Sequence, residues 1–124
     1  MAGVDFIVHN DVKILYEDYS ETEPEELLGL IDKAQRMIAT QPPHSVLALV
    51  NLKGAHYNKQ VTDRMKEFVK ANTPFIKTAA VFGMSNLQRV IYKGVLAVTG
   101  RKNLHVFASK EEALDFLVRQ TTEA

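Results

Sequence analysis

The stretch that most constrains the fold is the apolar run from Ser45 to Asn51, which lies between Pro42-Pro43 and Lys53-Gly54. A short, continuous apolar run closed by turn residues is typical of a strand buried on both faces of a sheet. The loop 52–57 follows, and a segment with helical spacing begins at Asn58. In an open α/β sheet, ligands bind at the loops that follow buried strands. The sequence therefore predicts that the functional end of the molecule includes this loop.

The rest of the chain alternates between strand-like and helix-like segments after an initial hairpin. Strands are expected at 6–9, 12–19, 45–51, 75–82 and 104–107, and helices at about 22–41, 58–71, 86–99 and from 109 onward. Val12, Ile14 and Tyr16 are expected on one side of the second strand. This order predicts one α/β domain over residues 1–124, with a mixed, mostly parallel sheet, an N-terminal hairpin and about four helices.

Capping signals mark the expected helix starts. Thr22 with Glu25 and Ser85 with Gln88 have capping-box spacing, and Gly100 suits a helix end. Helical spacing also predicts which side chains pack on the sheet. The predicted inner residues are Leu27, Leu30, Ile31, Ala34 and Ile38 in the first helix, Val61, Met65, Phe68 and Val69 in the second, and Leu87, Val90, Ile91, Gly94, Val95 and Val98 in the third.

Composition excludes several classes of function. Lysine plus arginine and aspartate plus glutamate number 15 each, so the net charge is zero and does not indicate a nucleic-acid binder. Without cysteine, the chain has neither disulfides nor zinc–thiolate sites. The first residues lack the blocks of a secretion signal, and no apolar run is long enough to span a bilayer, so a cytoplasmic location is expected.

The candidate ligand- or partner-binding site combines the 52–58 loop with the turn at 83–85. Its residues are Lys53, Gly54, His56, Tyr57, Asn58, Gly83 and Ser85. His56 is the best single polar candidate, although a lone loop histidine is usually only solvated. The turn could hold an anion on backbone N–H groups, or it is an ordinary strand-to-helix turn.

Known catalytic and metal-binding motifs are missing from the sequence. The four histidines lack metal-ligand spacing, and neither a P-loop nor a Gly-x-Ser-x-Gly elbow is present. We therefore expect no cofactor, no metal and no enzymatic activity, with an enzyme of unrecognised site as an alternative.

Several short motifs, taken in order, resemble one family. They are Ile14-Leu15-Tyr16, Glu26-Leu27-Leu28, Val50-Asn51-Leu52-Lys53-Gly54-Ala55-His56-Tyr57-Asn58, Thr99-Gly100-Arg101-Lys102 and Glu111-Glu112-Ala113-Leu114. Over nearly its whole length the chain resembles STAS domains, and within them the stand-alone branch related to the stage II sporulation AA protein, an anti-sigma-factor antagonist. More distantly it resembles the lipid-carrying CRAL-TRIO fold.

The resemblance implies a non-catalytic binding or regulatory module for a partner protein or a small apolar ligand. The alternative is a phospho-regulated anti-sigma-factor antagonist. Antagonists of the family carry a phosphorylatable serine at the start of the helix that follows the central strand. Here that stretch reads Asn58-Lys59-Gln60-Val61-Thr62, so Thr62 and Ser85 are the remaining acceptors to consider.

The third helix has more apolar residues than one face requires. Tyr92 and Leu96 are predicted on its outer face, beside Arg89 and Lys93. Because zero net charge leaves little repulsion between copies, we expect a homodimer through this face. The alternatives are docking on an acidic partner, contact with an anionic lipid surface, or scattered exposed apolar residues without a role.

Overall fold

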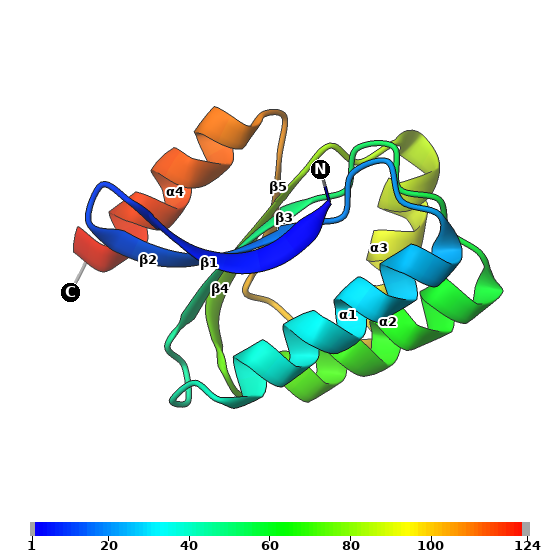
Figure 1. Cartoon of the computed structure of the whole chain (residues 1–124), viewed down its shortest axis with the longest axis horizontal. Helices are drawn as coiled ribbons and strands as arrows, with labels where there is room; N and C mark the ends of the chain where they lie inside the picture. The colour runs from blue at the N-terminus through cyan, green and yellow to red at the C-terminus, as the bar shows by residue number, and fades with distance from the viewer. Residues whose placement is uncertain (1, 123–124) are drawn as a thin grey trace.

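The computed structural model describes residues 2–122 and forms a five-stranded sheet with strands in the order β1-β2-β3-β4-β5 (Figure 1). The strands are β1 (Gly3–His9), β2 (Val12–Asp18), β3 (Val46–Asn51), β4 (Ile76–Phe82) and β5 (Leu104–Phe107). The helices are α1 (Pro24–Ala39), α2 (Lys59–Asn72), α3 (Asn86–Thr99) and α4 (Lys110–Thr122). The predicted mixed sheet, hairpin and four helices are confirmed.

Strands β1 and β2 form an antiparallel hairpin in which His9 pairs with Val12. Asn10 and Asp11 both have positive φ values, 49° and 64°. Two consecutive residues with positive φ form a tight two-residue turn whose twist matches that of the two strands it joins. Asn and Asp tolerate positive φ values well. The turn predicted at Asn10-Asp11 is therefore confirmed.

The other strand pairs are parallel, and each strand adds to the sheet beside its predecessor in the sequence. Right-handed crossovers that all progress in one direction place their helices on one face of a sheet. Accordingly α1, α2 and α3 lie on one side, whereas α4 packs on β3, β4 and β5 from the other (Figure 1). The molecule is thus three-layered, and β3 lies at the centre of its sheet.

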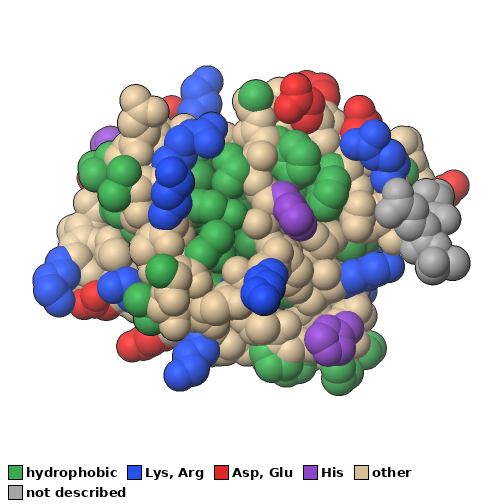
Figure 2. Space-filling view, turned by 180° about the vertical axis from the view of Figure 1, so that it is seen from behind, with side chains coloured by type: hydrophobic (Ala, Val, Ile, Leu, Met, Phe, Trp, Pro, Cys, Tyr) green, Lys and Arg blue, Asp and Glu red, His purple; other side chains and the backbone are tan. Residues whose placement is uncertain are grey.

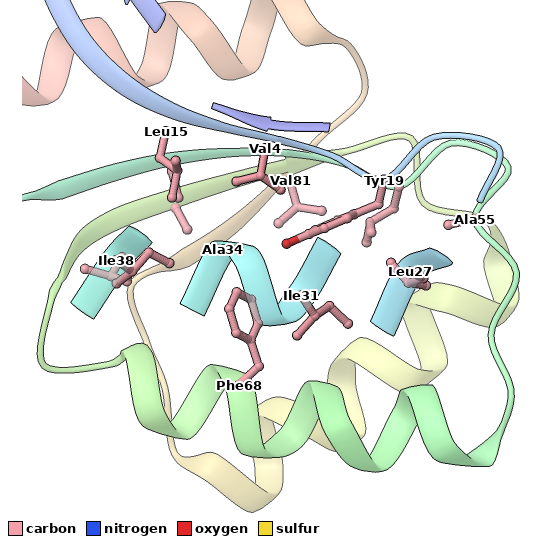
Figure 3. Close-up of a cluster of buried hydrophobic side chains, with 14 of the residues drawn as sticks. Val4, Leu15, Tyr19, Leu27, Ile31, Ala34, Ile38, Ala55, Phe68 and Val81 are labelled. Carbon is pink, nitrogen blue, oxygen red and sulfur yellow. The ribbon is translucent and has the colours of Figure 1, made fainter. Parts of the chain in front are cut away.

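Each face of the sheet has its own apolar core. Leu15 and Ala48 belong to the larger core under α1 and α2, and Figure 3 shows part of it around Tyr19 and Phe68. The smaller core, under α4, consists of the buried residues Ile14, Leu47, Leu49, Ala80, Phe82, Ala113 and Leu117. Because successive residues of β3 belong to different cores, the prediction of a strand buried on both faces is confirmed.

The predicted helix packing is mostly correct for α1 and α2. The fully buried residues of α1 include Leu27, Ile31, Ala34 and Ile38. In α2, Val61, Phe68 and Val69 are buried and Met65 is half-buried. Their spacing follows the helical period and so was readable in the sequence.

The predicted helix caps have different outcomes. Ser85 and Gln88 form the full capping box, and Gly100 ends α3 in the left-handed region with φ of 70°. The capping box predicted for Thr22 and Glu25 is wrong. Thr22 is fully buried, and its hydroxyl donates to the carbonyl of Tyr19 at 2.7 Å, so it belongs to the preceding turn.

The face assignment predicted for α3 is right only in part, because Val95 is buried and Ile91 is half-buried on the inner side, as predicted, but other residues differ. Leu87, Val90 and Val98 are 69%, 68% and 71% exposed, whereas Tyr92 and Leu96 turn inward. The reason lies in how α3 sits: it packs along α2 and not flat on the sheet. Its inner face is then fixed by individual polar contacts, and part of the apolar arc of the helix is left toward solvent.

Candidate functional site

The predicted site lies where the loops after β2, β3 and β4 meet. The N–H of Leu52 donates to Phe82 O at 3.0 Å, which joins the loops after β3 and β4. The N–H of Glu21 donates to Lys53 O at 2.9 Å, which joins the loops after β2 and β3. The structure therefore brings the predicted 52–58 loop and 83–85 turn together, as expected for the carboxyl ends of neighbouring parallel strands.

This junction is tightly fixed. The Gln88 amide donates to Leu52 O at 3.2 Å and to Ala55 O at 3.0 Å, so α3 is bonded to the 52–58 loop. Gly83 has φ of 82°, and a Cβ atom there would lie 2.8 Å from the backbone nitrogen of Lys53. Only glycine combines that backbone conformation with so close an approach.

Most polar groups of the predicted site serve the fold itself. Asn58 Oδ1 accepts from Val61 N at 2.8 Å, and Ser85 Oγ accepts from Gln88 N at 3.1 Å, so both side chains are helix caps. His56 Nδ1 lies 2.8 Å from Glu23 Oε1, and both side chains are exposed. Lys53 and Gly54 are exposed as well. Within residues 2–122 no cluster of three or more His, Asp or Glu side chains could hold a metal ion.

Beside this junction lies a cavity of 70 Å³ between α2, α3 and the inner face of the sheet. Its apolar walls include Val50, Met65, Phe68, Val69, Ala79, Val81, Met84, Ile91, Val95, Leu96 and Leu104. Of the residues predicted for the binding site, only Tyr57 lines it. On the face that Figure 2 presents, a recessed hydrophobic area lies beside a row of Lys or Arg side chains.

Two residues assigned to the outer face of α3 by the sequence, Tyr92 and Leu96, line this cavity instead. The Tyr92 hydroxyl donates to Leu104 O at 2.8 Å, which holds α3 against the β5 edge of the sheet. The other two predicted interface residues, Arg89 and Lys93, are exposed. The structure thus separates the four residues into an inward pair and an outward pair.

The cavity also contains a buried polar cluster that sequence reasoning missed. Glu17 and Arg101 both line it and are only 2% and 7% exposed. The Tyr19 hydroxyl donates to Glu17 Oε1 at 2.8 Å, and Arg101 Nε donates to Asn103 Oδ1 at 2.8 Å. Figure 3 shows the Tyr19 side chain extending into the space between the sheet and the helices.

Burial governs the electrostatics of this cluster. Loss of solvation raises the pKa of Glu17 to about 7, although the hydrogen bond from Tyr19 and the charge of Arg101 both oppose the shift. Burial lowers the pKa of Arg101, against the opposing influence of Glu17 and Tyr92. Burial also raises the pKa of the Tyr57 hydroxyl, so this group stays neutral at physiological pH. Glu17 alone among them changes charge near neutral pH.

One sequence signal could have located Glu17. Strand alternation places Leu15 and Glu17 on one face of β2 and continues to Tyr19, which follows the strand, and Leu15 and Tyr19 belong to the core. A carboxylate between two core positions is an unusual placement that invites a functional reading. Arg101 had no such signal, because it follows the end of α3 and reads as an ordinary surface charge.

Comparison with solved structures agrees with the fold. The chain is similar to the crystal structure of an uncharacterized protein from the DUF3478 family with a SpoIIAA-like fold from Shewanella loihica PV-4, at a TM-score of 0.71 and 16% identity, covering 94% of this chain and 95% of the other. It is also similar to an anti-sigma-factor antagonist (STAS) domain protein from Planctomyces limnophilus, at a TM-score of 0.61 and 12% identity, covering 94% and 99%. The chain therefore has a STAS-like, SpoIIAA-like fold, as predicted.

The comparisons reach no further than the fold. No protein-family model and no curated protein matches the sequence. Among residues 2–122, no helix combines the length and the apolar character needed to cross a bilayer.

Proposed function

We propose that this protein is a non-catalytic, cytoplasmic binding module that takes up a small apolar ligand in the cavity between α2, α3 and the sheet. The observation that carries the proposal is the cavity itself, with walls that are mostly apolar. Concave, mostly apolar sites with a few placed polar groups are typical of small-molecule binding. The polar groups of the neighbouring loops are engaged in caps and loop contacts, which favours binding over catalysis.

Two measurements on the freshly purified protein test the proposal. Native mass spectrometry reports any small molecule that stays bound. Xenon, which enters dry apolar cavities, serves as a ligand-independent probe, with its binding followed by NMR. We expect saturable xenon binding that shifts the resonances of cavity residues such as Val81 and Val95.

A matched pair of substitutions on α3 gives the control. Val95→Phe places a larger ring toward the cavity, whereas Val90→Phe makes the same change on the exposed face of the same helix. We expect xenon binding to be lost in Val95→Phe and kept in Val90→Phe. Absence of both xenon binding and a retained molecule in the wild-type protein would overturn the proposal.

A partner-binding role is favoured by a different observation. Leu87, Val90 and Val98 form an exposed apolar stripe on α3, and the basic residues Arg89 and Lys93 lie on the same helix. If the expected homodimer forms through α3, this stripe and not the inward pair Tyr92 and Leu96 supplies the apolar contact. The homodimer remains a prediction, as do docking on an acidic partner and contact with anionic lipid.

Phospho-regulation has weaker structural support. Ser85 Oγ already accepts a capping bond from Gln88 N, and Thr62 lies within the first turn of α2 and is half-buried. Modification at either position remains a prediction that intact-mass measurement of the protein from its own cells would test.

A further inference from the structure

The outer face of α3 has an apolar seam with the spacing of a helix–helix contact. The exposed stripe of Leu87, Val90 and Val98 is continued by Gly94 and Ala97, which are exposed as well. Intervals of three, four and three residues separate Leu87, Val90, Gly94 and Ala97. Residues spaced in this way form the narrow apolar line along which two helices pack in a coiled coil.

The shape of this face also fits a helix. Space is open where a Cβ atom at Gly94 would lie, so the middle of the seam is lower than its end at Leu87. A second helix can approach such a low point closely, whereas contact with a bilayer needs bulky apolar side chains along a broad face. A strand presents side chains to one side at every second residue, which does not match the seam.

Positive charge borders the seam on one flank. Lys93 follows Val90 by three residues and Arg89 by four, so the two cations are neighbours on the helix surface. Both are exposed, and among residues 2–122 neither side chain has an ion-pair or hydrogen-bond partner. Between Glu67 and Glu111 the sequence has no Asp or Glu, so neither α3 nor its adjoining loops supply a compensating carboxylate.

We propose that this face of α3 binds an acidic amphipathic helix of a partner protein. Leu87 and Val90 make the apolar contact, and Arg89 and Lys93 pair with carboxylates of the partner helix. Charges that border a helix–helix seam determine which partner is chosen. The inference deepens the partner-binding role described above and rests on it, and it does not depend on the cavity.

A second copy of the chain fits this face less well. Because α3 has no acidic residue, a two-fold pair of α3 helices brings no carboxylate to Arg89 or Lys93, whichever way the helices run. Like charges brought together at an interface act against association. An acidic helix should therefore displace the second copy from the homodimer that is expected through this face.

The test is an NMR titration of the whole protein with two synthetic helical peptides. Both have leucine along an apolar seam, and the residues that border the seam are all Glu in one peptide and all Lys in the other. We expect the Glu peptide to bind saturably and shift the amide resonances of α3, and the Lys peptide not to bind. Binding should weaken as salt is added, because ions screen exposed charge pairs. Light scattering should show that the Glu peptide dissociates any dimer.

A charge swap on α3 tests the two cations directly. Removing two exposed ion pairs lowers affinity roughly fivefold, and the repulsion that replaces them lowers it further. Arg89→Glu with Lys93→Glu should therefore bind the Glu peptide at least about fivefold more weakly and should gain binding of the Lys peptide. The control, Lys33→Glu with Arg36→Glu, makes the same change in net charge at exposed positions of α1, which packs along α2. It should bind both peptides as the wild type does.

Vesicles of equal parts phosphatidylglycerol and phosphatidylcholine form a third arm. Binding to these vesicles without binding of the Glu peptide would assign the face to an anionic lipid surface and overturn the inference. A dimer that the Glu peptide leaves intact would assign it to a second copy, with the same consequence. Equal binding of the two peptides would show that Arg89 and Lys93 do not select the partner, which also overturns the inference.

The failures of the separate proposals can be told apart. A monomeric wild type that binds neither peptide nor vesicles would overturn the partner-binding role together with this inference. Xenon binding in the cavity does not involve the outer face of α3, so the ligand-binding proposal would stand in that case. Should the charge-swap variant fail to fold, the comparison of the two peptides on the wild type still decides.

Discussion

Glu17 occupies a position on β2 where the sheet alternation calls for an apolar side chain. Its neighbours in the alternation, Leu15 and Tyr19, are fully buried, and among residues 2–122 its carboxyl has one hydrogen bond, from Tyr19. Burying a carboxylate costs more than burying the neutral acid, which is why the pKa is raised. The same effect makes the folded state sensitive to pH.

We predict that Glu17 makes the free energy of unfolding fall as pH rises. The pKa rises from 4.5 to about 7 on folding, so the folded chain binds the proton more tightly. The stabilising contribution of Glu17 is fully present below pH ~4.5 and is lost as pH rises to ~7. Above that pH it does not change further. At roughly 1.4 kcal/mol per pKa unit, the loss is about 3 kcal/mol.

Urea unfolding at pH ~5 and pH ~8 tests this prediction when the wild type is compared with Glu17→Gln. The glutamine variant shares every other titrating group, so only the difference between the two proteins reports on Glu17. That difference should change by roughly 2–3 kcal/mol across the interval, with the glutamine variant relatively more stable at the higher pH. Parallel pH profiles would show that Glu17 titrates normally in the folded chain.

At the scale of single residues, the sequence predicts the positions of those side chains that helical spacing, strand alternation or helix capping determines. The positions of Phe68 in the core and Ser85 at a helix start follow from spacing alone. Arg101 could not be placed in this way, because its side chain bonds to Asn103, and Asn103 in turn bonds to Ile76 O of β4, which is distant in sequence. Tertiary contact, not local pattern, decides where such a side chain goes.

Among the elements, α3 departs most from its sequence pattern. Gln88 is buried because its amide bonds two loop carbonyls, and Tyr92 turns inward because its hydroxyl finds Leu104 O. Buried polar groups need such partners, so they fix the rotation of the helix. The broad apolar arc of α3 is a weaker constraint, since the helix has no broad contact with the sheet.

This orientation of α3 predicts that two double substitutions on the helix change the stability of the protein by very different amounts. Tyr92→Glu with Leu96→Glu introduces carboxylates at the cavity wall and breaks the bond to Leu104 O, so it should destabilise the protein strongly, by several kcal/mol. Leu87→Glu with Val90→Glu changes exposed positions and should shift stability by less than about 1 kcal/mol. Urea unfolding midpoints measure both.

The two variants carry the same added charge on the same helix, so each controls for the other. Equal destabilisation would contradict the observed rotation of α3. A stable Tyr92 and Leu96 variant with a destabilised Leu87 and Val90 variant would restore the face assignment made from the sequence.

At the scale of the whole molecule, the order of elements was the most predictable property. Alternation of strands and helices after a hairpin leaves few topologies once crossovers are short and right-handed. Figure 1 shows the result, with α1, α2 and α3 on one face and α4 on the other. The cavity was not predictable, because it exists where α3 bridges from α2 to the sheet edge without filling the space beneath it.

The expected homodimer is the prediction that concerns the whole molecule. Zero net charge leaves little repulsion between copies, and the stripe of Leu87, Val90 and Val98 offers an apolar surface to a two-fold partner. We therefore expect gel filtration with light scattering to report a dimer for the wild type and a folded monomer for Leu87→Glu with Val90→Glu. A wild type that is monomeric at high micromolar concentration would show the dimer prediction to be wrong. A variant that stays dimeric would move the interface to another surface, and the outer edge of β1, the first strand of the sheet that residues 2–122 form, is the next to test.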